Sequence, residues 1–138
     1  MSAILDLYDG SIRAFVLGHS NNNQLEFDIL ELALQGAPGS PPLLHSNRGF
    51  QYTSHAFRHM TRVAGITQSM SRVGGCIDNG PMESFWGALK CESYYLHKFS
   101  EFDELRLAIQ KYIYFYKEKR YQQRLNGLAP LEYGTQAV

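Results

Sequence analysis

The chain has 138 residues, 44% of them apolar, 13% aromatic and 19% charged, a composition that fits one folded domain and excludes disorder or low complexity for the whole chain. Thirteen basic residues balance thirteen acidic ones, so the net charge neither indicates nor excludes a nucleic-acid partner. No run approaches the roughly 18 apolar residues of a membrane span and no leader pattern opens the sequence, so we expect a soluble, cytoplasmic protein.

The chain begins with the pattern of a β-hairpin. Two short apolar stretches, 2–8 and 12–18, flank an Asp-Gly pair at 9–10, which favours the backbone angles of a tight turn. A polar stretch then offers capping side chains to a helix over 24–35, which Gly36 would end. We therefore expect an antiparallel hairpin followed by one amphipathic helix.

Two further strands are expected around a second helix. Residues 43–45 predict a short buried strand, and Ser54 is placed to cap a helix from 55 to about 64. A short strand near 66–70 follows the glycine that ends this helix. Strand, helix and strand in this order are typical of an α/β layered fold with a mixed sheet.

The next stretch predicts a helix with one apolar side and one polar side. Asp78 or Asn79 can cap it, and Pro81 suits its first turn. Four residues at helical spacing form the apolar side: Met82, Phe85, Trp86 and Leu89. Glu83 and Lys90 share another side, so we expect both to point away from the core.

A last amphipathic helix is expected over 101–119, with a short tail around Pro130. Four cations and one anion lie within 117–124, close to several tyrosines. Basic side chains interleaved with rings can hold a phosphate backbone and stack on bases. The same cations also suit a solvated helix end, where the helix dipole favours positive charge. The pattern leaves both interpretations open.

Two places in this pattern could carry chemistry. In open α/β sheets, sites lie at the carboxyl ends of strands, and the loop 46–49 follows the strand at 43–45. The other place is Glu83 near the start of its helix. A carboxylate there is either favoured by the helix dipole or a ligand for a hard metal ion.

Motifs that resemble a known family are spread over nearly the whole chain. They are the residues from His45 to Ser54, Gly65-Ile66, Ser69-Met70-Ser71-Arg72, Asp78-Asn79, Glu83-Ser84-Phe85-Trp86, Leu89-Lys90, 112–120 and 128–133. In combination they resemble the catalytic core of bacterial insertion-sequence transposases of the retroviral-integrase type, the DDE family.

The resemblance implies a ribonuclease H-like mixed sheet flanked by helices, on which two Asp and one Glu hold two divalent ions, Mg²⁺ or Mn²⁺. In the family the last two acids are separated by 35 residues, as positions 47 and 83 are here. Glu83 therefore matches the third acid and a metal ligand. The implied reaction is DNA cleavage and strand transfer at the ends of a mobile element, by two-metal phosphoryl transfer.

Two departures from the family pattern bear on activity. Position 47 holds Asn, whose amide supplies one carbonyl oxygen and no negative charge. In the family, the strand with the first acid precedes the hairpin, and residues 1–138 begin at the hairpin. We therefore expect a single truncated catalytic-core domain, 1–138, that lacks its first, central strand, binds no metal tightly and is inactive by itself. The alternative is a non-catalytic module that associates with DNA or with itself.

The missing strand also bears on assembly. A central strand that is absent leaves two unpaired edges, which invite pairing with another chain. We expect the hairpin to close directly on the strand at 43–45, or two chains to form a strand-swapped homodimer.

The resemblance also suggests which side chains contact DNA. It places Lys90 beside the third acid and Arg72 in the loop before it, and the basic segment adds Lys119 and Arg120. For each, the alternative is a solvated cation. His45 and Ser46 could order the loop at 47 by hydrogen bonds, or serve capping and packing only.

Overall fold

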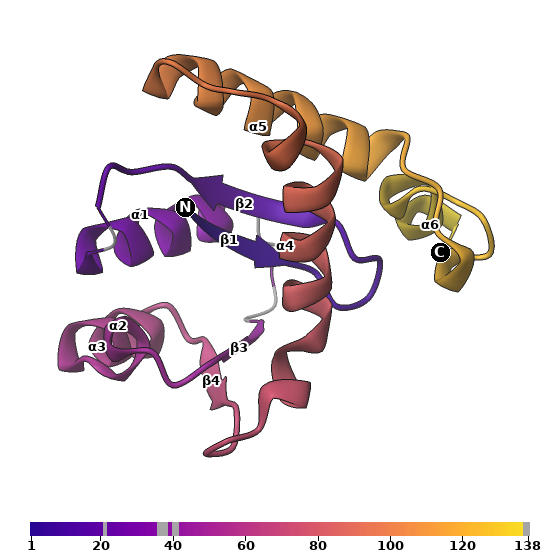
Figure 1. The fold of residues 1–138 in the computed structure, drawn as a ribbon. Coiled ribbons are helices and arrows are strands. Elements are labelled where there is room, and N and C mark those ends of the chain that lie inside the picture. The colour runs from indigo at the N-terminus through magenta and orange to yellow at the C-terminus, as the bar shows by residue number, and fades with distance from the viewer. Residues whose placement is uncertain (21, 36–38, 40–41, 137–138) are drawn as a thin grey trace. The chain divides into compact units, whose positions relative to one another are not determined.

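The computed structural model describes residues 1–20, 22–35, 39 and 42–136, and it is a mixed α/β structure with small sheets (Figure 1). The chain forms two compact units, which we describe one by one. The first comprises Met1–Ile4 and Arg13–Gly80, and the second comprises Leu5–Ile12 and Pro81–Val138. None of the helices in the described ranges is long and apolar enough to cross a membrane.

The predicted hairpin is present, with shorter strands and a wider turn. β1 (Ser2–Leu5) and β2 (Ile12–Val16) pair in a two-stranded sheet, and the six residues between them are too few for a parallel crossover. The amide of Asp6 donates to the carbonyl of Ser11 at 2.9 Å, which closes the turn. Gly10 adopts φ +76°, a left-handed angle that glycine takes without strain.

Two helices of the first unit begin at caps that the sequence predicts. Before α1 (Asn23–Gln35), the side-chain oxygen of Asn22 accepts a first-turn amide at 3.1 Å. Before α3 (His55–Val63), the hydroxyl of Ser54 accepts another at 3.2 Å. Such caps satisfy amides that have no partner inside the helix. Gly36, which we expected to end α1, lies outside the described residues.

The core of the first unit joins α1, α3 and the residue that follows the glycine after α3. Leu30, Phe57 and Ile66 are buried together, with half-buried apolar side chains around them. One of these neighbours is Tyr52, on the short helix α2 (Phe50–Thr53), which the sequence analysis did not predict. This small helix therefore packs on the core just before α3.

A second, separate sheet consists of β3 (Leu43–Ser46) and β4 (Thr67–Met70), paired in parallel with His45 opposite Ser69. The prediction of a buried strand at 43–45 is wrong in one respect, because Leu43 is 68% exposed. Within the described ranges, the hairpin forms no ladder with β3. The prediction that it closes directly on this strand is therefore wrong: in the described ranges β3 pairs along one edge with β4, and its other edge forms no ladder.

The second unit is built on two helices, preceded by a 3₁₀ turn (Cys76–Asn79) in the first unit. In α4 (Gly80–Glu92), Phe85 and Leu89 are buried as predicted. The Phe85 ring packs edge-on against Tyr116 of α5 (Phe102–Glu118), with ring centroids 5.0 Å apart. A second 3₁₀ turn (Tyr94–Leu96) lies between the two helices.

The predicted short tail is a packed element. After a 3₁₀ turn (Gln123–Leu125), α6 (Pro130–Gln136) begins with proline in its first turn. The carboxylate of Glu132 accepts the amide of Ala129 at 3.0 Å, which is half of a capping box. Ala129 has no exposed surface, so the tail prediction is wrong because this segment buries apolar side chains.

The hairpin turn packs against α6 within the second unit. The rings of Tyr8 and Tyr133 lie 5.7 Å apart, and the buried Asp9 lies beside Gly134. A methyl group added to Gly134 would come within 2.6 Å of Asp9 Oδ2. The hairpin turn and α6, more than 100 positions apart in the sequence, are thus in close contact where Asp9 lies against Gly134.

We expect Gly134→Ala to destabilise the protein by about 1–3 kcal/mol, because crowding outweighs the helix preference of alanine. The matched control is Gly87→Ala on α4, where an added methyl group meets nothing within 4 Å. This control should stabilise by up to about 1 kcal/mol. Urea unfolding measures both changes, and equal stabilisation by the two substitutions would contradict the packing described.

Candidate functional site

Asn47 lies directly after β3 in an exposed turn. Its side-chain oxygen accepts the amide of Gly49 at 2.8 Å, the hydrogen bond of an Asx turn. The carbonyl of Ser46 accepts the amide of Ser71 at 2.9 Å, which extends the pairing of β3 with the chain after β4. The pairing of Ser46 with Ser71 therefore fixes the backbone position from which the side chain of Asn47 extends. Asparagine and aspartate both form such turns, and the asparagine here forms it without a negative charge.

His45 links the two strands beside this turn. Its ring nitrogens lie 3.0 Å from the hydroxyl of Ser69 and 3.1 Å from that of Ser71. Arg48 adds a third link, because its Nε donates to the carbonyl of Ser71 at 2.8 Å. These bonds hold together the ends of β3 and β4, and the role of His45 in ordering the loop at 47 stays a prediction.

Glu83 and Lys90 lie on the exposed side of α4, as the helical spacing predicts. Glu83 is in the first turn and Lys90 in the last. Neither side chain has a hydrogen bond or ion pair with any residue that the structure describes. A carboxylate and an ammonium group are therefore both available to a ligand on this side of the helix.

Arg72 is held by an acid from its own loop. Its Nε donates to Asp78 at 3.2 Å and its Nη2 at 3.1 Å, and its backbone amide also donates at 3.0 Å. The side-chain bonds from Arg72 are the largest influence on Asp78 and lower the pKa of that carboxyl to about 2. Asp78 therefore serves this loop, and the prediction that it could cap α4 is not what the structure shows.

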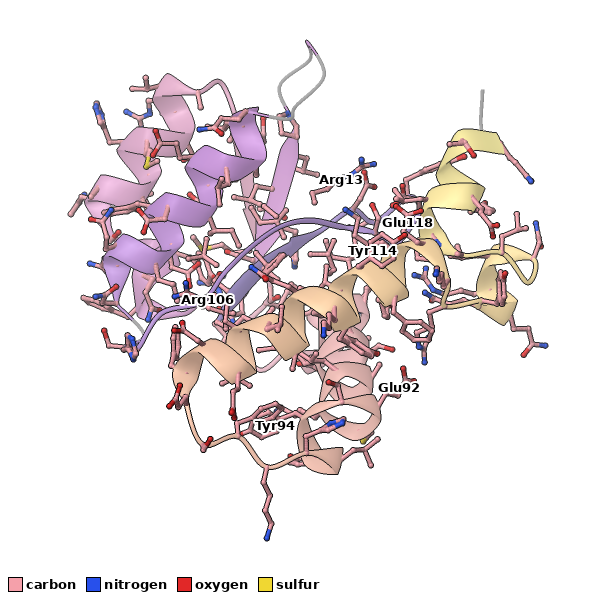
Figure 2. The ribbon with its side chains drawn as sticks, turned by 90° about the horizontal axis from the view of Figure 1, so that it is seen from above. Arg13, Glu92, Tyr94, Arg106, Tyr114 and Glu118 are labelled. Atoms are coloured by element: carbon pink, nitrogen blue, oxygen red, sulfur yellow. The ribbon has the colours of Figure 1, made fainter. Side chains whose placement is uncertain are left out.

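Arg120 is also bound to a carboxylate. Its guanidinium donates to Glu92 at the end of α4, with Nη2 2.6 Å from one oxygen and Nε 2.9 Å from the other. The hydroxyl of Tyr112 donates to the same carboxylate at 2.7 Å. Figure 2 shows Glu92 in the last turn of α4. Hydrogen bonding to Arg120 is the main reason that the pKa of Glu92 lies below its ordinary value.

Lys119 is more exposed than Arg120 and less constrained. Its ammonium group lies 5.7 Å from the ring centroid of Tyr114, a distance suited to a cation–π contact. Tyr114 itself is 57% exposed on α5, where Figure 2 labels it. Of the two residues of the basic segment that we expected to contact DNA, Arg120 is bound to a carboxylate of the fold and Lys119 is exposed at the surface.

The described ranges contain no group of three or more His, Cys, Asp or Glu side chains that could hold a metal ion. Asn47 belongs to the first unit and Glu83 to the second, and the position of one unit relative to the other is not determined. The neutral amide at 47 and the single exposed carboxylate at 83 do not fit a pair of divalent ions by themselves.

Sequence reasoning missed the role of Glu92 and Tyr112. Glu92 is separated from Arg120 by 28 positions, and no helical or strand period connects residues so far apart. The only sequence signal was Tyr112 itself, a polar ring on the predicted apolar side of α5. A buried tyrosine hydroxyl normally has a hydrogen-bond partner, so this pattern predicts an acceptor close to the hydroxyl of Tyr112.

We expect Arg120→Gln to lower stability at neutral pH by up to about 1 kcal/mol, the range for a partly exposed ion pair. Because the pKa of Glu92 is lowered in the fold, this ion pair stabilises above the unfolded pKa of about 4.3 and is lost as the pH falls through the folded value. The urea midpoint difference between parent and variant should shrink from pH 6 to pH 3. Arg62→Gln, an exposed control, should show no such pH dependence. A gap for Arg120→Gln that is constant with pH would contradict the pairing.

Comparison with known proteins shows what the chain is similar to. Residues 83–138 match the model of the integrase core domain. An uncharacterized transposase-like protein of Haemophilus influenzae is 40% identical over 138 residues, which is all of this chain and 64% of that protein.

Two insertion-element proteins match over almost the same range. The putative transposase InsK for insertion sequence element IS150 of Escherichia coli is 36% identical over 137 residues, 99% of this chain and 48% of that protein. The insertion element IS600 31 kDa protein of Shigella sonnei is 37% identical over 132 residues, 94% of this chain and 48% of that protein. The chain thus spans about half to two thirds of the length of these relatives. Over nearly its whole length the chain is similar to proteins of insertion elements, transposases among them, and residues 83–138 match an integrase core domain.

Proposed function

We propose that residues 1–138 are part of the catalytic core of a DNA transposase and that Glu83 is its third acid. The observation that carries this proposal is the exposed Glu83 on α4, which has no partner among the described residues and is separated by 35 residues from the turn at position 47. The names of the relatives support a role at the ends of an insertion element. The reaction class would be phosphodiester cleavage and strand transfer.

We further propose that this stretch of chain is inactive by itself. Two-metal phosphoryl transfer needs several carboxylates to balance two divalent cations, and the family pattern finds one of its three acids here, Glu83. The amide at 47 offers one neutral oxygen, and that oxygen already accepts a hydrogen bond from Gly49. Residual Mg²⁺ or Mn²⁺ binding at Glu83 would therefore be weak.

The two separate sheets support a single ribonuclease H-like domain that lacks a central strand. The hairpin sheet and the β3–β4 sheet are not joined within the described chain, and Leu43 of β3 is exposed. A strand placed between them would pair with both, as the family fold implies. A segment of the same protein outside residues 1–138, or a strand swapped from a second copy, could supply it.

DNA contacts would come mainly from the lysines. Lys90 and Lys119 are exposed, and Lys90 shares its helix face with Glu83. Arg72 and Arg120 are engaged with Asp78 and Glu92, so their contribution would be smaller. Phosphate contacts by lysine position the DNA without reading its sequence.

Metal binding tests the proposed role of Glu83. We expect the parent chain to show no saturable Mn²⁺ site below about 1 mM, by paramagnetic broadening of its NMR signals. Asn47→Asp should tighten binding because it adds a carboxylate, and Glu83→Gln in the same background should remove the gain. Asn47→Asp should still not cleave a supercoiled plasmid in Mn²⁺.

The control for this experiment is Glu31→Gln on α1, an exposed glutamate outside the proposed site. It should leave Mn²⁺ binding unchanged in both backgrounds. Cleavage by the parent chain would overturn the proposed inactivity. Equal binding by Asn47→Asp and its Glu83→Gln derivative would overturn the role of Glu83.

DNA binding tests Lys90. Each phosphate that a protein neutralises contributes about −0.9 to the slope of log affinity against log salt. We expect Lys90→Ala to weaken duplex binding and to reduce the magnitude of this slope by about 0.9. Lys98→Ala, an exposed control outside the proposed face, should leave the slope unchanged. Identical slopes for Lys90→Ala and the parent would contradict the assignment.

The alternative function is a non-catalytic module that binds DNA or a second copy. The amide at position 47 favours it, because that substitution removes charge and keeps the turn. DNA binding or dimerisation without any Mn²⁺ effect in the Asn47→Asp variant would select this alternative.

A further inference from the structure

One exposed side of α3 consists of arginine and histidine side chains. The other side of this helix packs into the core of the first unit through Phe57 and Thr61, which are both buried. The exposed residues follow the i, i+3, i+4, i+7 spacing of a single helix face. They are His55, Arg58, His59 and Arg62. We call these four residues the α3 stripe.

The charge of the α3 stripe is not balanced within the described fold. Residues 32–77 contain four arginines and no Asp or Glu, although the whole chain has as many acidic as basic residues. Of the elements packed against α3, α2 and β4 contain no charged residue, and α1 contacts it through the stacked rings of Phe27 and Phe57. None of the four stripe side chains has a hydrogen bond or ion pair with any residue that the structure describes.

The α3 stripe also works against the helix that carries it. Arg58 and Arg62 are four positions apart, and like charges at this spacing destabilise a helix. The first turn contains no acidic residue that could interact favourably with the positive end of the helix dipole. Arg72 and Arg120, by contrast, are each paired with a carboxylate. A local arrangement that costs stability without a compensating contact in the fold is typical of a binding site.

We propose that the α3 stripe is a DNA-contact surface of the first unit, which binds the sugar-phosphate backbone of a duplex. Arg58 and Arg62 would each neutralise one phosphate, and the ring N–H groups of His55 and His59 would donate further hydrogen bonds. Seven helical positions rise about 10 Å, close to three steps of one DNA strand at about 3.4 Å each, so the stripe can follow a strand. The choice of DNA as partner rests on the proposed function, whereas the unbalanced charge does not.

The double variant Arg58→Gln/Arg62→Gln tests this surface, because it removes two charges and keeps two long side chains. For a duplex of random sequence, the slope of log affinity against log salt should fall in magnitude by about 1.8, twice the value of about 0.9 for one phosphate. The ratio of parent to variant affinity should therefore rise about tenfold when the salt is lowered from about 200 mM to about 50 mM. Fluorescence anisotropy of a labelled duplex in EDTA measures both quantities.

The stability of the same variant separates a binding role from a structural one. Removing like charges from one helix face should leave the midpoint of urea unfolding unchanged or raise it, because these arginines have no partner to lose among the described residues. A lowered midpoint would show that Arg58 and Arg62 stabilise the fold, and it would overturn the proposal.

Two controls accompany this variant. Lys98→Gln/Lys111→Gln removes the same charge from exposed positions of the second unit and should keep the parent slope. Arg58→Lys/Arg62→Lys keeps the charge on the stripe and should also keep the slope, since the contact is with phosphates. An equal fall of the slope in Lys98→Gln/Lys111→Gln would show an effect of net charge alone and would overturn the site.

The outcomes separate this inference from the proposed function. A parent slope in Arg58→Gln/Arg62→Gln, together with a reduced slope in Lys90→Ala, would overturn the DNA contact at α3 alone. Failure of Asn47→Asp to gain Mn²⁺ binding would sink the catalytic proposal and leave the α3 stripe intact, because its readout needs no metal. Tighter binding of poly-glutamate than of the duplex, with the same dependence on both arginines, would assign the stripe to an acidic protein and overturn the choice of DNA.

Discussion

Burial of one side of α4 is the constraint on which the candidate chemistry depends. Phe85 has no exposed surface, and its ring packs edge-on against Tyr116 of α5. Because the helix repeats every 3.6 residues, burying Phe85 and Leu89 leaves Glu83 and Lys90 on the side that faces water. A rotation of α4 that hid the carboxylate would expose the ring. The exposed acid is therefore a consequence of hydrophobic packing.

The sequence predicts the parts of this fold that depend on neighbours within one or two turns. The cap at Ser54 and the two-sided character of α4 are of this kind, and both are present in the structure. The parts it missed depend on distant partners. α6 forms where the hairpin turn supplies apolar surface, and Leu43 is exposed because β3 pairs only with β4 in the described chain. No local period reports such contacts.

The candidate site divides in the same way. Local spacing placed Glu83 on a free helix face, but its link to position 47 came from the family resemblance. The Asx turn at Asn47 uses only the side-chain oxygen, and asparagine makes the same turn as aspartate. Under the proposed function, the fold therefore requires the turn at 47, whereas catalysis requires a negative charge there.

The most direct test of this account is the separation of positions 47 and 83 in solution. Two ligands of one metal pair have oxygens no more than about 8 Å apart, given ion spacings near 4 Å and ligand bonds near 2 Å. Spin labels at 47 and 83, in a chain with Cys76 and Cys91 replaced by serine, report this separation by dipolar EPR. The account predicts a single short distance. A long or broad distribution would show that Glu83 does not share a site with position 47.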